Sequence, residues 1–135
     1  MSISANIDGK SLLKALNAFP KNIQKNVMIG ATRAAANVVR DRSRELVPKR
    51  TKNLSKSIVS IQQKAESGQI KFSVTPSRGG KYDGWYAHFI EFGTVKMSAK
   101  PFMRPAMEQM QDESLNAAEE YIAKRIPEEV MRSKQ

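Results

Sequence analysis

Two titratable side chains inside an aromatic segment, residues 85–92, are the first candidates for chemistry. His88 is the only histidine of the chain, and Glu91 is the only carboxylate of that segment. A histidine can act as a general base or as a metal ligand, and a carboxylate among aromatic side chains can do acid–base work. However, no second metal ligand stands at a suitable spacing, and there is no Gly-rich phosphate loop or serine elbow. We therefore predict structural roles for both residues, no cofactor, no metal site and no enzymatic activity.

A basic first half of the chain offers a different chemistry, the attraction of acidic surfaces or nucleic acid. The net charge is +10, and residues 1–64 hold thirteen Lys and Arg against three Asp and Glu, whereas residues 105–135 hold four against seven. Such a patch binds nucleic acid without sequence preference, in a salt-dependent way. Charged residues on solvated helix faces explain the excess equally well, through solubility. The residues that could face DNA are Arg33, Arg40, Arg44, Lys49 and Arg50.

The length and composition of the chain indicate one globular domain. A chain of 135 residues suits a single hydrophobic core, so we expect residues 1–135 to form one domain. The absence of cysteine excludes disulfides and thiolate metal sites. The first residues lack the pattern of a secretory signal, and no apolar run reaches the roughly 18 residues of a membrane span. We expect a protein that is made and used in a cytoplasm and has no contact with a membrane.

Helical periodicity predicts a short first helix and two long helices. The first lies within residues 1–19, and the second runs from about 21 to 46, where Val47-Pro48 ends it. The last opens at 101–105 and should end near Ile126, because Pro127 follows, which leaves residues 127–135 as a flexible tail. The residues expected to be buried on this last helix are Met107, Met110, Ser114, Ala117 and Tyr121.

The segments between the long helices predict a small antiparallel sheet. Residues 58–63 are rich in β-formers, and residues 69–75 alternate strictly between apolar and polar side chains, so together they predict a hairpin. We expect a basic loop at 49–55, a Gly-rich loop at 76–84 and a short aromatic helix at 85–92. The predicted fold is α+β, with a small antiparallel β-sheet packed against two long α-helices.

The aromatic helix and the prolines that follow it predict a docking surface. Aromatic side chains and rigid apolar anchors dominate protein interfaces, and we expect Phe102 to be such an exposed anchor between its flanking prolines. Glu91 would fix the loop by accepting hydrogen bonds from the 93–94 backbone or by pairing with Arg104. The residues of this predicted assembly interface are Trp85, Tyr86, Phe89, Glu91, Phe92, Pro101, Phe102 and Arg104.

Two stretches of sequence resemble a known family. Leu46-Val-Pro-Lys-Arg-Thr-Lys-Asn-Leu-Ser-Lys-Ser-Ile58 is similar to a helix end followed by a Thr-Gly-Asn/Arg-Leu turn and a Ser-Ile strand start, except that Lys52 replaces the glycine. Tyr86-Ala-His-Phe-Ile-Glu-Phe-Gly-Thr94 and Lys100-Pro-Phe-Met-Arg-Pro-Ala106 resemble its second half. Over roughly residues 20–125 the chain resembles the phage family named after the tenth gene product of a lambda-like coliphage, whose members serve in tail completion, necks or head-to-tail joining.

The resemblance implies an α+β structural protein of a tailed-phage virion, located in the tail or neck and assembled in the host cytoplasm. Such a subunit would form a homo-oligomeric ring, sixfold if it matches a tail tube, and would contact tail tube, terminator or head-connector proteins. The basic residues at 33–56 and the acidic residues at 112–120 could pair across neighbouring subunits, or the basic face could meet passing genomic DNA. The alternative is a free-standing, sequence-independent nucleic-acid-binding protein.

Overall fold

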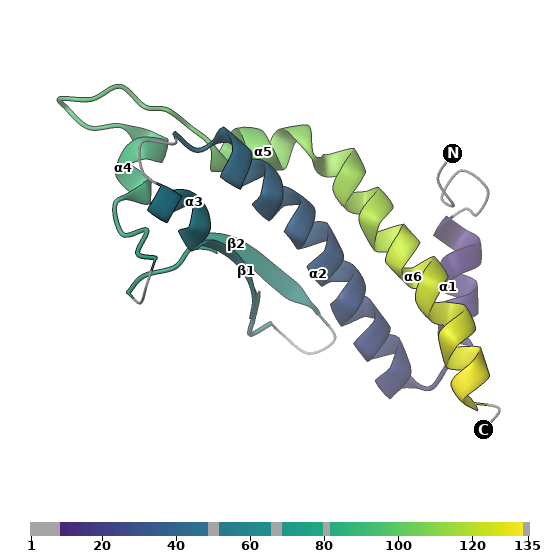
Figure 1. Ribbon diagram of the computed structural model, residues 1–135. Helices are drawn as coiled ribbons and strands as arrows, with labels where there is room; N and C mark the ends of the chain where they lie inside the picture. The colour runs from purple at the N-terminus through teal and green to yellow at the C-terminus, as the bar shows by residue number, and fades with distance from the viewer. Residues whose placement is uncertain (1–8, 49–51, 66–68, 80–81, 134–135) are drawn as a thin grey trace.

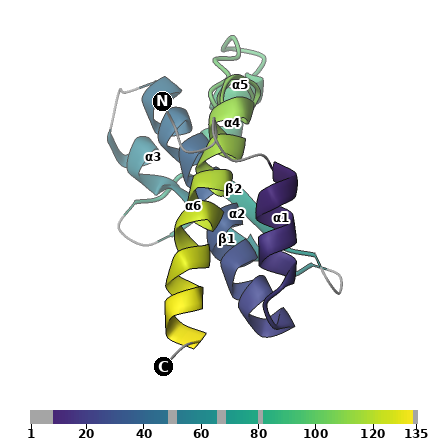
Figure 2. The same ribbon diagram turned by 90° about the vertical axis from the view of Figure 1, so that its right-hand side faces the viewer.

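Two long helices lying side by side dominate the computed structural model, which describes residues 9–48, 52–65, 69–79 and 82–133 (Figure 1). Helix α2 spans Lys21–Leu46 and α6 spans Gln111–Ser133. The short α1, Gly9–Asn17, packs against both, chiefly against α6 (Figure 2). A two-stranded sheet lies on the other side of α2, so α2 is the central element of the fold.

Prolines set both ends of α2. Pro20 occupies the N-cap position and Pro48 follows the C-cap residue Val47, which is extended at ψ 139° as a residue before proline must be. The bounds predicted from the sequence are confirmed. In the middle of α2, Gly30 lies directly against the Tyr121 ring of α6, and a Cβ atom at this position would overlap that ring. The missing side chain therefore lets the two long helices approach closely.

The molecule has two hydrophobic clusters, one at each end of α2. The first joins α1, α2 and α6, and its buried residues are Leu12, Leu16, Val27, Ala31 and Ile122. The second joins the end of α2 to the sheet, the aromatic helix and the segment before α5, and its buried residues are Val47, Leu54, Ile58, Ala87 and Phe102. The second cluster is the base on which the predicted docking segment stands.

The predicted hairpin is confirmed, with its second strand starting two residues later than expected. Strand β1, Ile58–Gln63, pairs antiparallel with β2, Lys71–Pro76, in a register that runs from Ile58 opposite Pro76 to Gln63 opposite Lys71. Side chains alternate between the two faces of such a pair. The face that carries Ser60 and Phe72 meets α2, because the Ser60 hydroxyl donates to the Asn37 side chain.

The basic loop expected at 49–55 is wrong over its second half, since residues Lys52–Ser57 form helix α3. Residues 49–51 lie outside the described residues. Helix α3 is a single short turn whose Leu54 side chain is 1% exposed, and the Ser57 hydroxyl donates to the Leu54 carbonyl at 2.6 Å. Burial of Leu54 in the second cluster stabilises the helical conformation of this polar segment. The sequence pattern of the segment does not indicate a helix.

The single last helix predicted from the sequence is in fact two. Helix α5, Met103–Gln109, ends at Met110 and α6 begins at the next residue, and Met107 is exposed rather than buried. The prediction that Pro127 ends the last helix is also wrong, because α6 continues through Pro127 to Ser133. Contacts beyond the proline outweigh the lost hydrogen bond, since Glu129 is only 3% exposed and pairs with Arg125 across it. That residues 1–135 form one domain stays a prediction.

Candidate assembly surface

A projecting loop is the most conspicuous feature of the surface. Helix α4, Ala87–Phe92, leads into residues 93–101, here called the arm, which extend away from the two long helices before the chain returns to α5 (Figure 1). At its tip Thr94 and Met97 exchange two backbone hydrogen bonds, of 2.9 and 3.2 Å. The tip of the arm is thus a tight turn closed by an isolated bridge between these two residues.

Glu91 closes the base of the arm. Its carboxylate accepts hydrogen bonds from the backbone amides of Phe102 at 3.2 Å, Met103 at 2.8 Å and Arg104 at 3.4 Å. The Lys100 amide adds a bond of 2.8 Å to the Ile90 carbonyl. The predicted structural role of Glu91 therefore has a geometric basis, but both predicted partners are wrong. Its donors are the amides at the start of α5, not those at 93–94, and the Arg104 guanidinium pairs with Glu108.

Replacing Glu91 by alanine is expected to loosen the arm while leaving the rest of the fold intact. Hydrogen bonds to a charged acceptor contribute about 1.5–3 kcal/mol, so denaturant unfolding should show a loss in that range. Amide hydrogen exchange should accelerate most at Phe102 and Met103. The amides of α2 should slow or accelerate only as much as the free energy of global unfolding changes. Unchanged exchange at 102–104 would show that Glu91 does not hold the arm.

The arm and α4 expose a group of large apolar side chains. Trp85 meets Phe89 edge to face at a centroid distance of 6.2 Å, and Phe92 remains 80% exposed. At the tip of the arm Val95 is fully exposed and Met97 is 41% exposed. Val95 and Met97 were not among the predicted interface residues, because an isolated apolar residue in a polar loop gives no periodic signal. Trp85, Phe89, Phe92, Val95 and Met97 are called the apolar surface below.

Phe102 corrects the predicted docking anchor. Its side chain is completely buried, at 0% exposure, among Val47, Leu54 and Ile58 of the second cluster. The prediction that it is an exposed anchor is wrong, because the ring at the N-cap of α5 is enclosed by the second cluster, which includes Ala87 of α4. Phe102 therefore anchors the arm to the body and offers no contact surface to a partner.

The structure divides the remaining predicted interface residues between two clefts on either side of α4. A cleft of about 550 Å³ brings together Trp85, Glu91, Phe92, Pro101 and Arg104, with Arg78 at its edge. A second cleft, of about 470 Å³, is lined by Tyr86 and Phe89 together with Met97 and Lys100 from the arm. Seven of the eight predicted residues thus lie around α4 and the arm.

The basic face of α2 is turned toward the sheet. The Arg33 guanidinium lies over the Phe72 ring at 5.5 Å, and Arg44 donates to the Ile58 carbonyl from two nitrogens, at 3.0 and 2.6 Å. Arg40 pairs with Asp41 at 3.0 Å. Lys49 and Arg50 lie outside the described residues. Arg33 and Arg44 thus help to hold the sheet on α2, whereas Arg40 pairs within the helix. That any of these arginines faces DNA stays a prediction.

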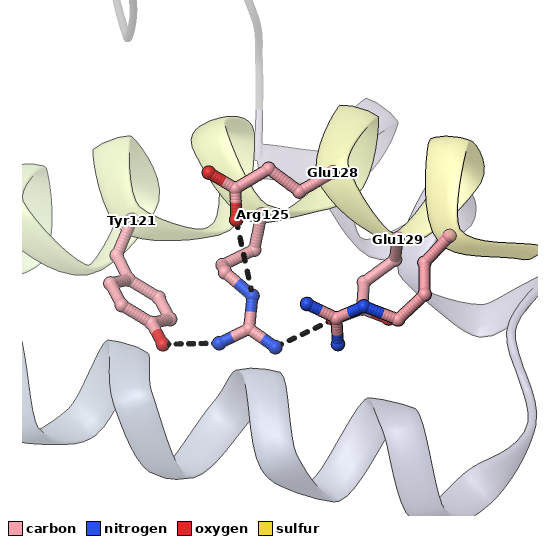
Figure 3. Close-up of polar contacts among 5 residues, drawn as sticks. Tyr121, Arg125, Glu128 and Glu129 are labelled. Atoms are coloured by element: carbon pink, nitrogen blue, oxygen red, sulfur yellow. Dashed lines mark hydrogen bonds and ion pairs between the residues drawn. The ribbon is translucent and has the colours of Figure 1, made fainter.

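A polar network between the long helices was missed by the sequence reasoning. Arg125 donates to the Tyr121 hydroxyl and to Glu129, both at 2.7 Å, on the side of α6 that faces α2 (Figure 3). The hydrogen bond to Glu129 is the main reason that the pKa of Arg125 is raised above its ordinary value. The spacing of four residues between Arg125 and Glu129 was the available signal.

The remaining candidate for chemistry, His88, lies on the outer side of α4. His88 is exposed, and its ring lies against Phe89 at a centroid distance of 4.0 Å. The described part of the chain contains no group of three or more residues placed to hold a metal ion. Among the helices of this part, none is long and apolar enough to cross a membrane. The other surface features are the projecting arm, the apolar surface and the charged helix faces, all of which are suited to contact with other proteins.

Comparison with known protein families agrees with that description. The model of the HK97-gp10-like family, described as "Bacteriophage HK97-gp10, putative tail-component", matches residues 10–93. This match covers more than half of the chain, so the protein belongs to the HK97-gp10-like family of phage tail components. The match ends at the first residue of the arm, so the Pro-Phe-Met-Arg-Pro motif lies beyond it. No curated protein and no solved structure matches the chain significantly.

Proposed function

We propose that this protein is a ring-forming subunit of a tailed-phage virion that acts in tail completion or head-to-tail joining. The family supports a structural role in the phage tail. The observation that carries the finer proposal is the arm, because Val95 and Phe92 are held in solvent by a base that Glu91 and Phe102 make rigid. An exposed apolar group of this kind on a rigid support is typical of a docking surface.

The partners in this proposal are copies of the same chain and the neighbouring tail tube, terminator or head-connector proteins. Asp112, Glu113 and Glu120 of α6 are exposed and supply an acidic face to such contacts. Complementary charge steers the approach of two surfaces, and salt screens it. The role is one of contact, without catalysis, in the tail or neck of the particle.

Silencing the gene in the phage or prophage that encodes it tests this function directly. If the protein joins heads to tails, electron microscopy should show separate DNA-filled heads and finished tails. If it completes tails, the tails should be unfinished or of abnormal length. Supplying the wild-type gene from a plasmid should restore infectious particles. Normal particles in its absence would disprove the proposed function.

A further inference from the structure

An apolar trough runs along α2 on the side between the sheet and α5. It has a volume of about 730 Å³, and small side chains such as Ala35 and Ala36 form its floor. Phe72 and Val74 of β2 line one wall, and Met103 and Met107 line the other. The hydroxyls of Ser43 and Ser114, which also line it, are buried without a hydrogen-bond partner among the described residues. The trough is thus largely apolar and contains two hydroxyls that have no hydrogen-bond partner among the described residues.

The β2 wall of the trough is an open sheet edge. The Ser77 amide donates to the Ser57 carbonyl, so these two residues form a hydrogen-bonded pair of the antiparallel ladder. Hydrogen-bonded and non-hydrogen-bonded pairs alternate along such a ladder, which makes Phe72 and Val74 members of non-hydrogen-bonded pairs. By this alternation the backbone groups of Phe72 and Val74 point away from β1. No other described strand pairs with β2. An open edge of this kind is a ready place for another segment of backbone to bind.

We propose that the trough receives the arm of a second copy of this chain. No arm residue lines the trough of its own molecule, and the arm projects away from it (Figure 1). In this contact Val95 and Met97 leave solvent and pack over the small side chains of α2. The backbone of the arm then lies within reach of the open groups of Phe72 and Val74.

The positive charge of the arm is complementary to two carboxylates next to the trough. The arm carries Lys96 and Lys100 and no acidic residue. On the trough side Asp112 and Glu113 stand in the first turn of α6, next to the lining residues Gln111 and Ser114, and both are exposed. The described ion pairs include neither of these carboxylates. The lining itself carries two cations, Lys71 on the β2 wall and Arg104 on the opposite wall, and Arg104 is paired with Glu108. The two lysines can therefore meet unpaired carboxylates.

The contact joins two different surfaces, so a pair of subunits still has one free arm and one free trough. Such head-to-tail contacts close into rings when the rotation between subunits permits. The inference rests on the proposed ring and deepens it by naming the surface that accepts the arm.

Because the chain has no cysteine, disulfide trapping can test this contact. One copy carries Val95→Cys and a differently sized tagged copy carries Ala36→Cys, and the two are mixed and mildly oxidised. The mixed disulfide should form at least about tenfold faster than in a control that pairs Val95→Cys with Leu13→Cys, because docking raises the local thiol concentration. Leu13 is exposed on α1, away from the trough, and serves as the matched site.

A charge reversal in the same assay tests the role of the lysines. Lys96→Glu with Lys100→Glu should slow the mixed disulfide, and Asp112→Lys with Glu113→Lys on the trough copy should restore it. Equal rates for the Ala36 and Leu13 pairs would overturn the proposal, as would predominant Val95 to Val95 dimers, which would mean that two arms meet. These results do not depend on the gene-silencing test, so the contact and the function can fail separately.

Discussion

The Phe102→Ala variant should lose about 3–5 kcal/mol of the free energy of unfolding, the cost of removing a buried aromatic ring and leaving a cavity. Phe102 has no exposed surface and shares the second cluster with Val47 after α2, Leu54 of α3 and Ile58 of β1. Losses of this size are a large fraction of the stability of a small domain. Urea denaturation followed by circular dichroism measures it directly.

The matched control is Val95→Ala, which removes an apolar side chain from the fully exposed tip of the arm. Exposed substitutions usually change stability by less than about 0.5 kcal/mol, so this variant should unfold like the wild type. If Phe102→Ala also unfolded like the wild type, the ring would not lie in the core. Phe102 would then return as a candidate docking anchor.

The Arg125→Met variant should lose about 3 kcal/mol, because it leaves the Glu129 carboxylate buried with one weaker partner. Glu129 is 3% exposed and bonds to Arg125 at 2.7 Å and to Arg132 at 3.2 Å. Methionine keeps most of the aliphatic stem of the arginine, so the loss reports mainly on the charge. Because the pKa of Arg125 is raised, its contribution is fully present below the ordinary arginine pKa and is lost only as the pH rises through the raised value.

Two further variants separate the buried pair from its surroundings. Arg132→Met should cost at most about 1 kcal/mol, because the Arg132 side chain is 69% exposed. Combining Arg125→Met with Glu129→Leu should recover most of the stability, since no unpaired charge then remains. If the double variant were as unstable as Arg125→Met alone, the loss would come from packing and not from the buried carboxylate.

Both stability predictions concern elements that support the two proposed contact surfaces, the arm and the trough. Phe102 and Glu91 fix the two sides of the base of the arm, one by burial and the other by three amide hydrogen bonds. The Arg125 network lies between α6 and α2, the helix that forms the floor of the trough. A preorganised arm and a preorganised trough lose less entropy on docking, which favours assembly from dilute subunits.

Local patterns in the sequence were sufficient for the elements of the fold. Pro20 and Pro48 bracket α2 because proline restricts its own backbone and that of its predecessor, and both ends were predicted correctly. Strict alternation in β2 predicted the hairpin, and the motifs around Thr94 indicated the phage tail family to which the chain belongs. The α+β class follows from these elements together.

The tertiary structure alone decided which side of each element is buried. Phe102 between prolines reads as an exposed anchor, Pro127 reads as a helix end and Arg44 reads as part of an open basic face. In the structure Phe102 is buried, α6 continues through Pro127, and Arg44 donates to the Ile58 carbonyl. For Phe102 and Arg44 the deciding contact comes from residues distant in sequence. For Pro127 it comes from Glu129, which lies beyond the expected helix end. Periodicity and spacing describe the backbone within a segment, whereas burial depends on which segments meet.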